Sequence, residues 1–377
     1  GDLTPLVKAG INDWGGVSPL TPDYVNPESP WPHTQRLAQS TADAGKVLQQ
    51  RLTIYPRYAH DLARWAAPNV ATAILQKMDA AGFAREDDWL TGQSEGAPKH
   101  IVSAVYAKTK NDHVDSQIAA TLEQLQSDHA DHVTAADLAR LFHARGPSFS
   151  AVCQSANALR QEVCGDAVSY AVNRNINYTN MCTYRCQFCA FSKGKRLVGM
   201  NEPAYNISTD EIVQRSVEAW ANGSTEVCLQ GGIHPSYTGE TYLAICRAIK
   251  KALPDMHIHA FSPLEVSQGA ATLGLSLKDF LRELKNAGLN SMPGTAAEIL
   301  HDDVRDILCA DKINTAEWLE VMETAHNLGI RTTATIMFGH VDRYEHWITH
   351  LLHIRELQAK TGGFTEFVPL PFVANEA

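Results

Sequence analysis

Hydrophobic and polar residues follow two different rhythms along this chain. Between Thr34 and Gly146, apolar residues recur every three or four positions, which is the spacing of one face of an amphipathic helix. After Ser148 the rhythm changes to short apolar runs, each followed by a longer amphipathic stretch. Strands that alternate with helices in this way form a parallel sheet. The pattern therefore predicts a mostly helical segment followed by an α/β segment.

Six strand and helix units can be counted in the α/β segment. The predicted strands are residues 176–178, 226–230, 257–261, 289–291, 331–337 and 364–368. The predicted helices are residues 209–222, 239–252, 277–287, 297–308, 316–328 and 343–360. Six consecutive units predict a partial (β/α)6 barrel of the TIM type and not a closed eightfold barrel. The chain stops at Ala377, just beyond the sixth strand, so we expect the barrel to be incomplete at its C-terminal end.

The N-terminal residues differ from both segments in composition. Five of the fourteen residues from Pro19 to Pro32 are proline, which excludes regular helix and favours extended or turn structure. We therefore predict three parts: a tail and proline-rich linker at 1–33, a helical connecting region at 34–147 and the barrel at 148–377. Because the chain begins with glycine and not with methionine, we expect it to be a piece of a longer protein.

Composition narrows the class of protein further. A chain of 377 residues with 44% apolar content can bury a large core. The net charge is −10 and the basic residues are scattered, so we expect no nucleic-acid partner. No apolar run approaches the roughly 18 residues that a membrane span requires, so we expect no membrane association. Free thiols fit a reducing compartment, which predicts a cytoplasmic protein. We expect five isolated cysteines to be small core residues, at positions 153, 164, 228, 246 and 309.

The other three cysteines form the most informative motif in the sequence. Cys182, Cys186 and Cys189 lie within eight residues, directly after the first predicted strand. Thiolates are soft ligands that hold iron and sulfur, so a loop this short can bind one iron–sulfur cluster. A structural zinc site needs four ligands, and no Cys or His follows within twenty residues of Cys189. A disulfide framework is disfavoured by the odd number of thiols and by the reducing context.

This Cys-x3-Cys-x2-Cys motif resembles that of the radical S-adenosylmethionine (SAM) superfamily. The resemblance implies that Cys182, Cys186 and Cys189 hold three irons of a [4Fe-4S] cluster and that SAM occupies the fourth iron. It also implies that Phe188, just before the last cysteine, lies next to the adenine of SAM.

The ends of the next strands supply the remaining candidate SAM contacts, since reacting groups in such barrels come from the carboxyl ends of strands. By the same resemblance, Gly231 and Gly232 receive the amino group of SAM, while Ser262 and Glu265 face its ribose and methionine. An alternative for Ser262 and Glu265 is a helix cap. Glu298, after the fourth strand, matches a segment that lies against SAM.

Three further polar residues are candidates for substrate contacts. His234 follows the glycine pair, His340 follows the fifth strand and Glu366 lies in the sixth, and the last two are expected to point to the same face. Core or surface roles explain these residues equally well at this stage.

Two segments suggest a subgroup of the superfamily. Residues 173–372 resemble the CofH-type enzyme of deazaflavin synthesis and the menaquinone-pathway enzymes MqnC and MqnE, most specifically at 259–263 and 367–372. The stretch from Trp14 to Pro22 resembles the C-terminal end of CofG-type enzymes. A CofG-like tail followed by a CofH-like barrel is the order of fused bifunctional deazaflavin (FO) synthases, so we expect a CofG-like module in the same parent chain.

That resemblance implies a reaction. A radical formed from SAM at the cluster would abstract hydrogen from L-tyrosine, and the 4-hydroxybenzyl group would be joined to 5-amino-6-(D-ribitylamino)uracil. A reductase, flavodoxin or ferredoxin would donate the electron. Three alternatives stay open: an MqnC-type futalosine cyclase of menaquinone synthesis, a non-catalytic iron–sulfur or zinc module, and a helical scaffold that has lost catalysis.

Overall fold

A computed structural model describes residues 3–15, 17, 33–85, 113–127, 130–167, 169–189 and 204–372. The chain divides into two compact units, Gly1–Asp166 and Ala167–Ala377. Each unit is described here by itself. The predicted proline-rich segment 19–32 lies outside the described residues.

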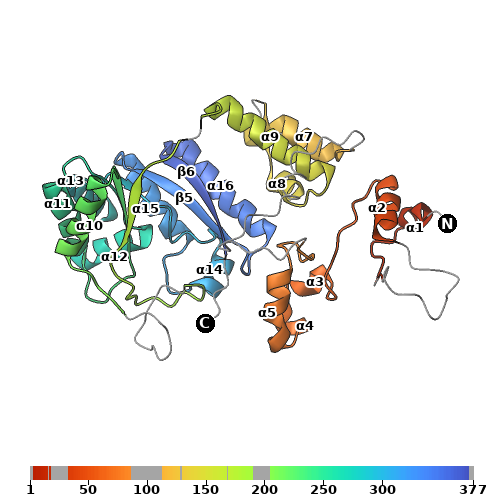
Figure 1. The fold of residues 1–377 in the computed structure, drawn as a ribbon, viewed down its shortest axis with the longest axis horizontal. Helices are drawn as coiled ribbons and strands as arrows, with labels where there is room; N and C mark the ends of the chain where they lie inside the picture. The colour runs from red at the N-terminus through yellow and green to blue at the C-terminus, as the bar shows by residue number, and fades with distance from the viewer. Residues whose placement is uncertain are drawn as a thin grey trace. The chain divides into compact units, whose positions relative to one another are not determined.

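The first unit is helical, as the sequence predicts (Figure 1). Asp13 forms a salt bridge with Arg51, and Trp14 donates a hydrogen bond to Thr41, so the described part of the N-terminal segment packs on this unit. Its helices are α1 (Thr4–Lys8), α2 (Thr34–Asp43), α3 (Pro56–Ala59), α4 (Leu62–Trp65), α5 (Pro68–Lys77), α7 (Ser116–Leu125), the 3-10 turn η1 (Ala130–His132), α8 (Ala135–Phe142) and α9 (Pro147–Cys164).

The second unit contains a six-stranded parallel sheet with strand order β1-β2-β3-β4-β5-β6. This order confirms the predicted partial (β/α)6 barrel. The strands are β1 (Asn173–Asn177), β2 (Glu226–Gln230), β3 (His257–Ala260), β4 (Ser291–Met292), β5 (Arg331–Phe338) and β6 (Phe364–Pro371). The helices are α10 (Thr209–Ala221), α11 (Gly239–Ala252), α12 (Pro263–Leu273), α13 (Leu277–Ala287), α14 (Asp302–Leu308), α15 (Thr315–Asn327) and α16 (Tyr344–Thr361).

Alternate strand residues define the two faces of this sheet. Val227 and Leu229 of β2 and Ile258 and Ala260 of β3 are fully buried in the main core with apolar residues of α11 and α13. The residues between them, such as Cys228 and His259, point to the opposite face because successive side chains alternate. That opposite face carries mostly polar side chains.

Two helix predictions need correction. The helix predicted at 297–308 begins only at Asp302, because Ala296 and Glu298 adopt positive φ angles of 64° and 43° that an α-helix does not contain. Helix α12 was predicted only indirectly, through the alternative that Ser262 and Glu265 form a helix cap. It is buried along Pro263–Val266 and at Gly269 and Ala270, so it lacks the polar face that marks a surface helix.

The limit between the helical region and the barrel differs from the expected position. Helix α9 lies in the first unit, and the division falls at Asp166/Ala167, whereas the barrel part was expected to begin at residue 148. None of the helices in the described ranges is long and apolar enough to cross a membrane.

Candidate functional site

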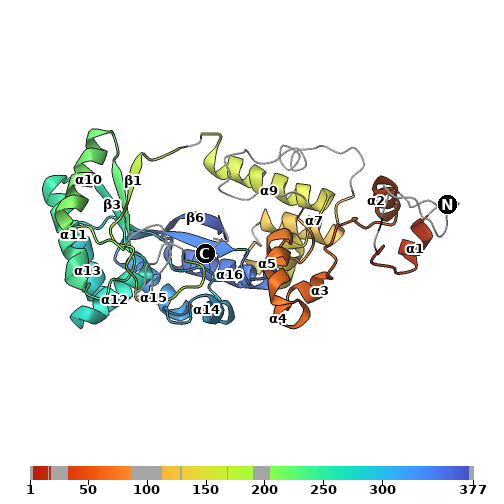
Figure 2. The same ribbon diagram turned by 60° about the horizontal axis from the view of Figure 1, so that its bottom comes forward.

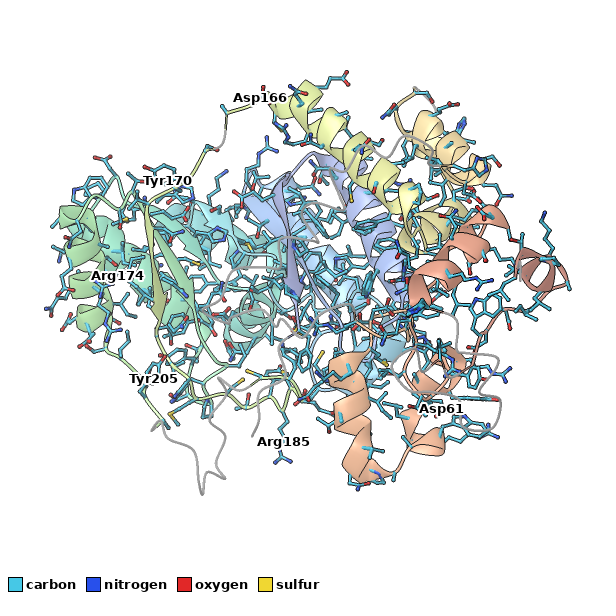
Figure 3. All side chains as sticks on the ribbon, turned by 45° about the vertical axis from the view of Figure 1, so that its right-hand side comes forward. Asp61, Asp166, Tyr170, Arg174, Arg185 and Tyr205 are labelled. Atoms are coloured by element: carbon cyan, nitrogen blue, oxygen red, sulfur yellow. The ribbon has the colours of Figure 1, made fainter. Side chains whose placement is uncertain are left out.

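The cysteine loop leaves the carboxyl end of β1. In Figure 2, β1 and β3 lie in the sheet of the second unit, where β2 pairs with both of them. In Figure 3, Tyr170 lies near the amino end of β1, and Arg185 and Tyr205 lie beyond its carboxyl end. The backbone amide of Tyr205 donates to Asn180 Oδ1 at 2.8 Å, and the Tyr205 carbonyl accepts a hydrogen bond from the Thr179 hydroxyl. Tyr205 therefore lies beside the start of the loop. The loop is thereby fixed at its base.

Backbone contacts with the end of β2 hold the first cysteine. The amide of Ile233 donates to Cys182 Sγ at 3.4 Å, and the amide of Thr183 donates to the Ile233 carbonyl at 3.0 Å. The Gly232 amide donates to the Thr179 carbonyl at 2.9 Å. The segment after β2 is therefore paired with the cysteine loop along several residues.

The glycine pair permits this close approach. A Cβ at Gly232 would lie 2.3 Å from the Met181 carbonyl oxygen and 2.9 Å from Cys182 Cβ. A Cβ at Gly231 would lie 2.3 Å from the ring of Tyr178. Real Cβ atoms do not approach other atoms this closely, so both positions require glycine for packing.

The second half of the cysteine loop lies on the connection between α14 and α15. The Gln187 amide donates to the Leu308 carbonyl at 3.0 Å, and the Arg185 amide donates to Asp311 Oδ2 at 3.0 Å. Phe188 packs with Cys186 against the small core around Ile299, and Lys312 Nζ lies 5.4 Å from the Phe188 ring centroid. Cys182 and Cys186 are thus positioned by different parts of the barrel.

Lys312 and Glu298 form a buried ion pair beside this loop. Their side chains are each 11% exposed, and Nζ lies 2.7 Å from Oε1. Burial disfavours the ammonium, but the Glu298 carboxylate and the nearby Cys186 outweigh it and raise the pKa of Lys312 above its ordinary value. The backbone carbonyl of Glu298 also accepts a hydrogen bond from the Met337 amide, at 2.8 Å.

Ser262 and Glu265 form the capping box of α12, which is the alternative that the sequence left open. The Ser262 amide and hydroxyl each donate to Glu265 Oε2 at 2.6 Å. The hydroxyl of Tyr178, a fully buried side chain, donates to the other carboxylate oxygen. Burial raises the pKa of Glu265, while these donors and the Gly231 amide act in the opposite direction. Glu265 therefore ties together the ends of β1, β2 and β3.

The three candidate substrate residues do not form one cluster of contacts among the described residues. His234 Nδ1 lies 2.8 Å from Ser236 Oγ, and its ring packs on Tyr237. His340 packs edge-on against Phe372, and its buried Nδ1 has no hydrogen-bond partner in the part of the chain that the structure describes. Burial lowers the pKa of His340. Glu366 is exposed on β6.

The three thiols fit an iron–sulfur cluster by their chemistry. Cys182, Cys186 and Cys189 are free and partly buried on one short loop, and together they supply the soft sulfur donors that such clusters take. Burial raises the pKa of the Cys186 thiol to about 12, and Lys312 opposes this shift. No three His, Cys, Asp or Glu side chains of the described chain are already gathered as metal ligands.

Comparison with known families decides the class of this barrel. Residues 176–354 match the family model of the radical SAM superfamily. The chain contains a radical SAM domain. Membership of this superfamily implies a [4Fe-4S] cluster and SAM as cofactors.

Curated relatives extend beyond the radical SAM domain. The chain is 41% identical to the FO synthase of Streptomyces coelicolor over 99% of its own length and 47% of that protein. It is 42% identical to the FO synthase of Mycobacterium leprae over 98% of its length and 46% of that protein. It thus spans about half the length of these relatives. It is also 52% identical, over 58% of its length and 60% of the relative, to the 5-amino-6-(D-ribitylamino)uracil--L-tyrosine 4-hydroxyphenyl transferase of Methanocaldococcus jannaschii.

Solved structures show the same fold. The FeFe-hydrogenase maturase HydG from Carboxydothermus hydrogenoformans matches 68% of this chain and 57% of its own, with a TM-score of 0.53 and 17% identity. Methylornithine synthase PylB matches 69% of each chain, with a TM-score of 0.52 and 17% identity.

Lys312 and Tyr178 were not predicted from the sequence as residues of the candidate site. Lys312 lies in a short connection without any motif, and its partner Glu298 is 14 residues away. Tyr178 has the sequence context of an ordinary strand residue, although its hydroxyl donates to Glu265, 87 positions later. The one available signal was the position of Tyr178 at a strand end, where side chains of such barrels reach the site.

Proposed function

We propose that this radical SAM domain is the tyrosine-transferring part of an FO synthase. It joins the 4-hydroxybenzyl group of L-tyrosine to 5-amino-6-(D-ribitylamino)uracil. The observation that carries the proposal is the 52% identity over 221 residues with the transferase of Methanocaldococcus jannaschii. The FO synthase relatives support it, since they align with 98% or more of the chain, the helical first unit included. These names favour deazaflavin synthesis over futalosine cyclisation.

In this proposal Cys182, Cys186 and Cys189 hold the cluster. When bound, the cluster and SAM supply an organic radical that removes a hydrogen atom from tyrosine. The chain's own residues bind and orient the reactants and keep water away from them. The residues proposed to shape the SAM site are Phe188, Gly231, Gly232, Ser262, Glu265 and Glu298. Three contacts support this role, because SAM must lie beside the cluster loop: Gly232 packs on that loop, Ser262 donates to Glu265, and Glu298 pairs with Lys312 next to Phe188.

The partners of the domain are also proposals. A CofG-like module in the same parent chain is consistent with the length of the FO synthase relatives, which is about twice that of the aligned part. A reductase, flavodoxin or ferredoxin donates the electron. His234 after β2, His340 after β5 and Glu366 within β6 are proposed as substrate contacts.

Anaerobic turnover of the reconstituted protein tests the proposal. The protein is given reductant, SAM and tyrosine with the ribitylaminouracil, or separately dehypoxanthine futalosine. Mass spectrometry follows 5'-deoxyadenosine and any adduct. We expect a hydroxybenzyl adduct of the uracil that requires tyrosine. Turnover with the futalosine alone would assign the domain to menaquinone synthesis instead.

A pair of cysteine variants tests the role of the cluster loop. Cys186→Ala should abolish 5'-deoxyadenosine formation, because one cluster ligand is lost. Cys164→Ala is the matched control, since Cys164 is an exposed free thiol at the end of α9 in the other unit. It should retain activity. Full turnover by Cys186→Ala would contradict the proposed assignment.

A further inference from the structure

A row of polar side chains crosses β3 and β4 on the face of the sheet opposite the helices. Ser291 Oγ lies 2.8 Å from His257 Nε2 and 2.8 Å from His259 Nδ1. The row continues to β2, where Glu226 Oε2 lies 3.7 Å from His257 Nε2, and to β1, where Asn173 donates to Glu226. The transferase proposal does not use any of these residues.

The shared hydroxyl gives the two imidazoles opposite hydrogen-bonding roles. Ser291 has a single hydroxyl proton, so it can donate to one imidazole and must accept from the other. The Glu226 carboxylate favours the proton on His257 Nε2. His257 therefore donates to Ser291, and Ser291 donates to His259 Nδ1. A neutral His259 then carries its own proton on Nε2.

His259 stays neutral at physiological pH and offers a free donor. Burial lowers its pKa, and His257 acts in the same direction, while Glu226 and Glu366 oppose the shift. Among the described residues, no group accepts a hydrogen bond from Nε2 of His259. Nε2 is also absent from the set of fully buried polar atoms that lack a partner, so it is not fully buried. The Nε2–H group is thus available to a ligand on this face.

The place of His259 in the fold connects it to the site. It is the penultimate residue of β3, and the chain continues directly into the Phe261–Glu265 segment that packs on Tyr178. The neighbouring side chain on β2 is Cys228, its partner in the strand register, and Gln230 follows two residues later on the same face. Glu366 of β6 acts on the same imidazole electrostatically.

The chemistry of this face suits an uncharged polar ligand. Asparagine, glutamine, serine and neutral imidazole groups pair well with ring carbonyls and hydroxyls. Free tyrosine is a zwitterion whose carboxylate would require a cation, whereas the described groups that act electrostatically on His259 are the carboxylates of Glu226 and Glu366 and the imidazole of His257, with no Lys or Arg among them. The ribitylaminouracil carries two ring carbonyls and a polyol chain, and it therefore matches the face better.

We propose that His259 donates its Nε2–H hydrogen bond to a carbonyl or hydroxyl oxygen of the ribitylaminouracil, with Ser291 as the positioning residue that orients its ring. This inference rests on the proposed transferase function. It assigns to the β3–β4 face the binding of the heterocyclic substrate, while tyrosine binds elsewhere in the site.

Anaerobic dissociation constants for the ribitylaminouracil, tyrosine and SAM test this assignment. In the full chain, His259→Asn keeps an amide near the Nδ1 position but loses the donor at Nε2. His259→Gln is the matched control, because its amide nitrogen reaches the Nε2 position. We expect about tenfold weaker binding of the ribitylaminouracil for His259→Asn, since a ligand oxygen is left unpaired. Affinities for tyrosine and SAM should change less than about twofold, and His259→Gln should restore most of the loss.

Ser291→Ala supplies an independent variant if His259→Asn does not fold. It removes the orienting hydroxyl and should weaken ribitylaminouracil binding severalfold without affecting SAM. Unchanged ribitylaminouracil binding in these variants, or a loss confined to tyrosine, would overturn the assignment. Wild-type turnover separates the two proposals: absence of the hydroxybenzyl adduct refutes the transferase function, whereas adduct formation with normal binding by the variants refutes only the role of His259.

Discussion

The buried ion pair between Lys312 and Glu298 gives the sharpest stability prediction. Changing Lys312 to Met leaves the Glu298 carboxylate buried without its partner. Changing Glu298 to Gln likewise leaves the Lys312 ammonium buried without its partner. Removing one member of a buried pair costs about 3–5 kcal/mol, because the remaining charge has lost both water and its partner. The double variant contains neither charge, so we expect it to be more stable than either single variant.

The exposed pair Arg247–Glu240 provides a matched control. Both pairs have the same N–O distance of 2.7 Å, but the side chains of the control pair are 52% and 60% exposed, against 11% for each member of the buried pair. Exposed pairs contribute only about 0.2–1 kcal/mol. Burial is therefore the main difference between the two double-mutant cycles. We expect a coupling free energy of about 3 kcal/mol or more for Lys312–Glu298 and under about 1 kcal/mol for the control.

Urea-dependent hydrogen exchange, followed by mass spectrometry of peptides from residues 290–340, measures these free energies within the second unit. The apoprotein is used for all variants so that cluster binding does not contribute to stability. Additive effects of the Lys312 and Glu298 substitutions, within about 0.5 kcal/mol, would refute the reasoning. Equal coupling in both cycles would also refute it, because burial would then not determine the strength of the pair.

Three further predictions concern the same unit. Gly232→Ala places a Cβ 2.3 Å from a carbonyl oxygen of the cysteine loop, so it should cost about 1–3 kcal/mol and lower the iron bound per chain after reconstitution; normal iron content would contradict this. Tyr178→Phe removes a hydrogen-bond donor to Glu265 and should lower the free energy of unfolding by about 1–3 kcal/mol in the same exchange assay. An unchanged free energy of unfolding would show that this hydrogen bond does not stabilise the unit. Burial lowers the pKa of His326 to about 4 and that of His350 to about 3, so the unfolded chain, with pKa values near 6.5, binds the protons first. Stability therefore falls as the pH drops below about 6.5, by about 2 kcal/mol per histidine at pH 5, and each His→Gln variant should flatten this dependence.

The strands of the barrel could be predicted because their signal is local. Strand β2 was predicted at its observed limits, Glu226–Gln230, since Val227 and Leu229 alternate with more exposed neighbours. Strand β4 shows the limit of this signal. It has only two residues, Ser291 and Met292, whereas the predicted strand begins at Leu289, a buried residue just before the observed strand.

The contacts that shape the site could not be predicted, because they join residues far apart in sequence. Ser291 and His259 are 32 positions apart, and Tyr178 and Glu265 are 87 apart. No periodicity within a short window reports such pairs. The cysteine motif was visible because all its members lie on one loop, but the support of that loop by Leu308 and Asp311 appears only in the folded chain.

The support of the cysteine loop affects how SAM-site variants must be interpreted. Gly232 packs on the backbone beside Cys182, and Glu298 holds Lys312 next to Cys186 and Phe188. A substitution at either position therefore disturbs the proposed cluster ligands as well as any contact with SAM. Iron content must be measured before SAM affinity, because a variant that has lost iron cannot report on SAM. A Glu298 variant with normal iron content and weakened SAM binding would establish a direct contact, whereas parallel loss of both would assign Glu298 to the support of the loop.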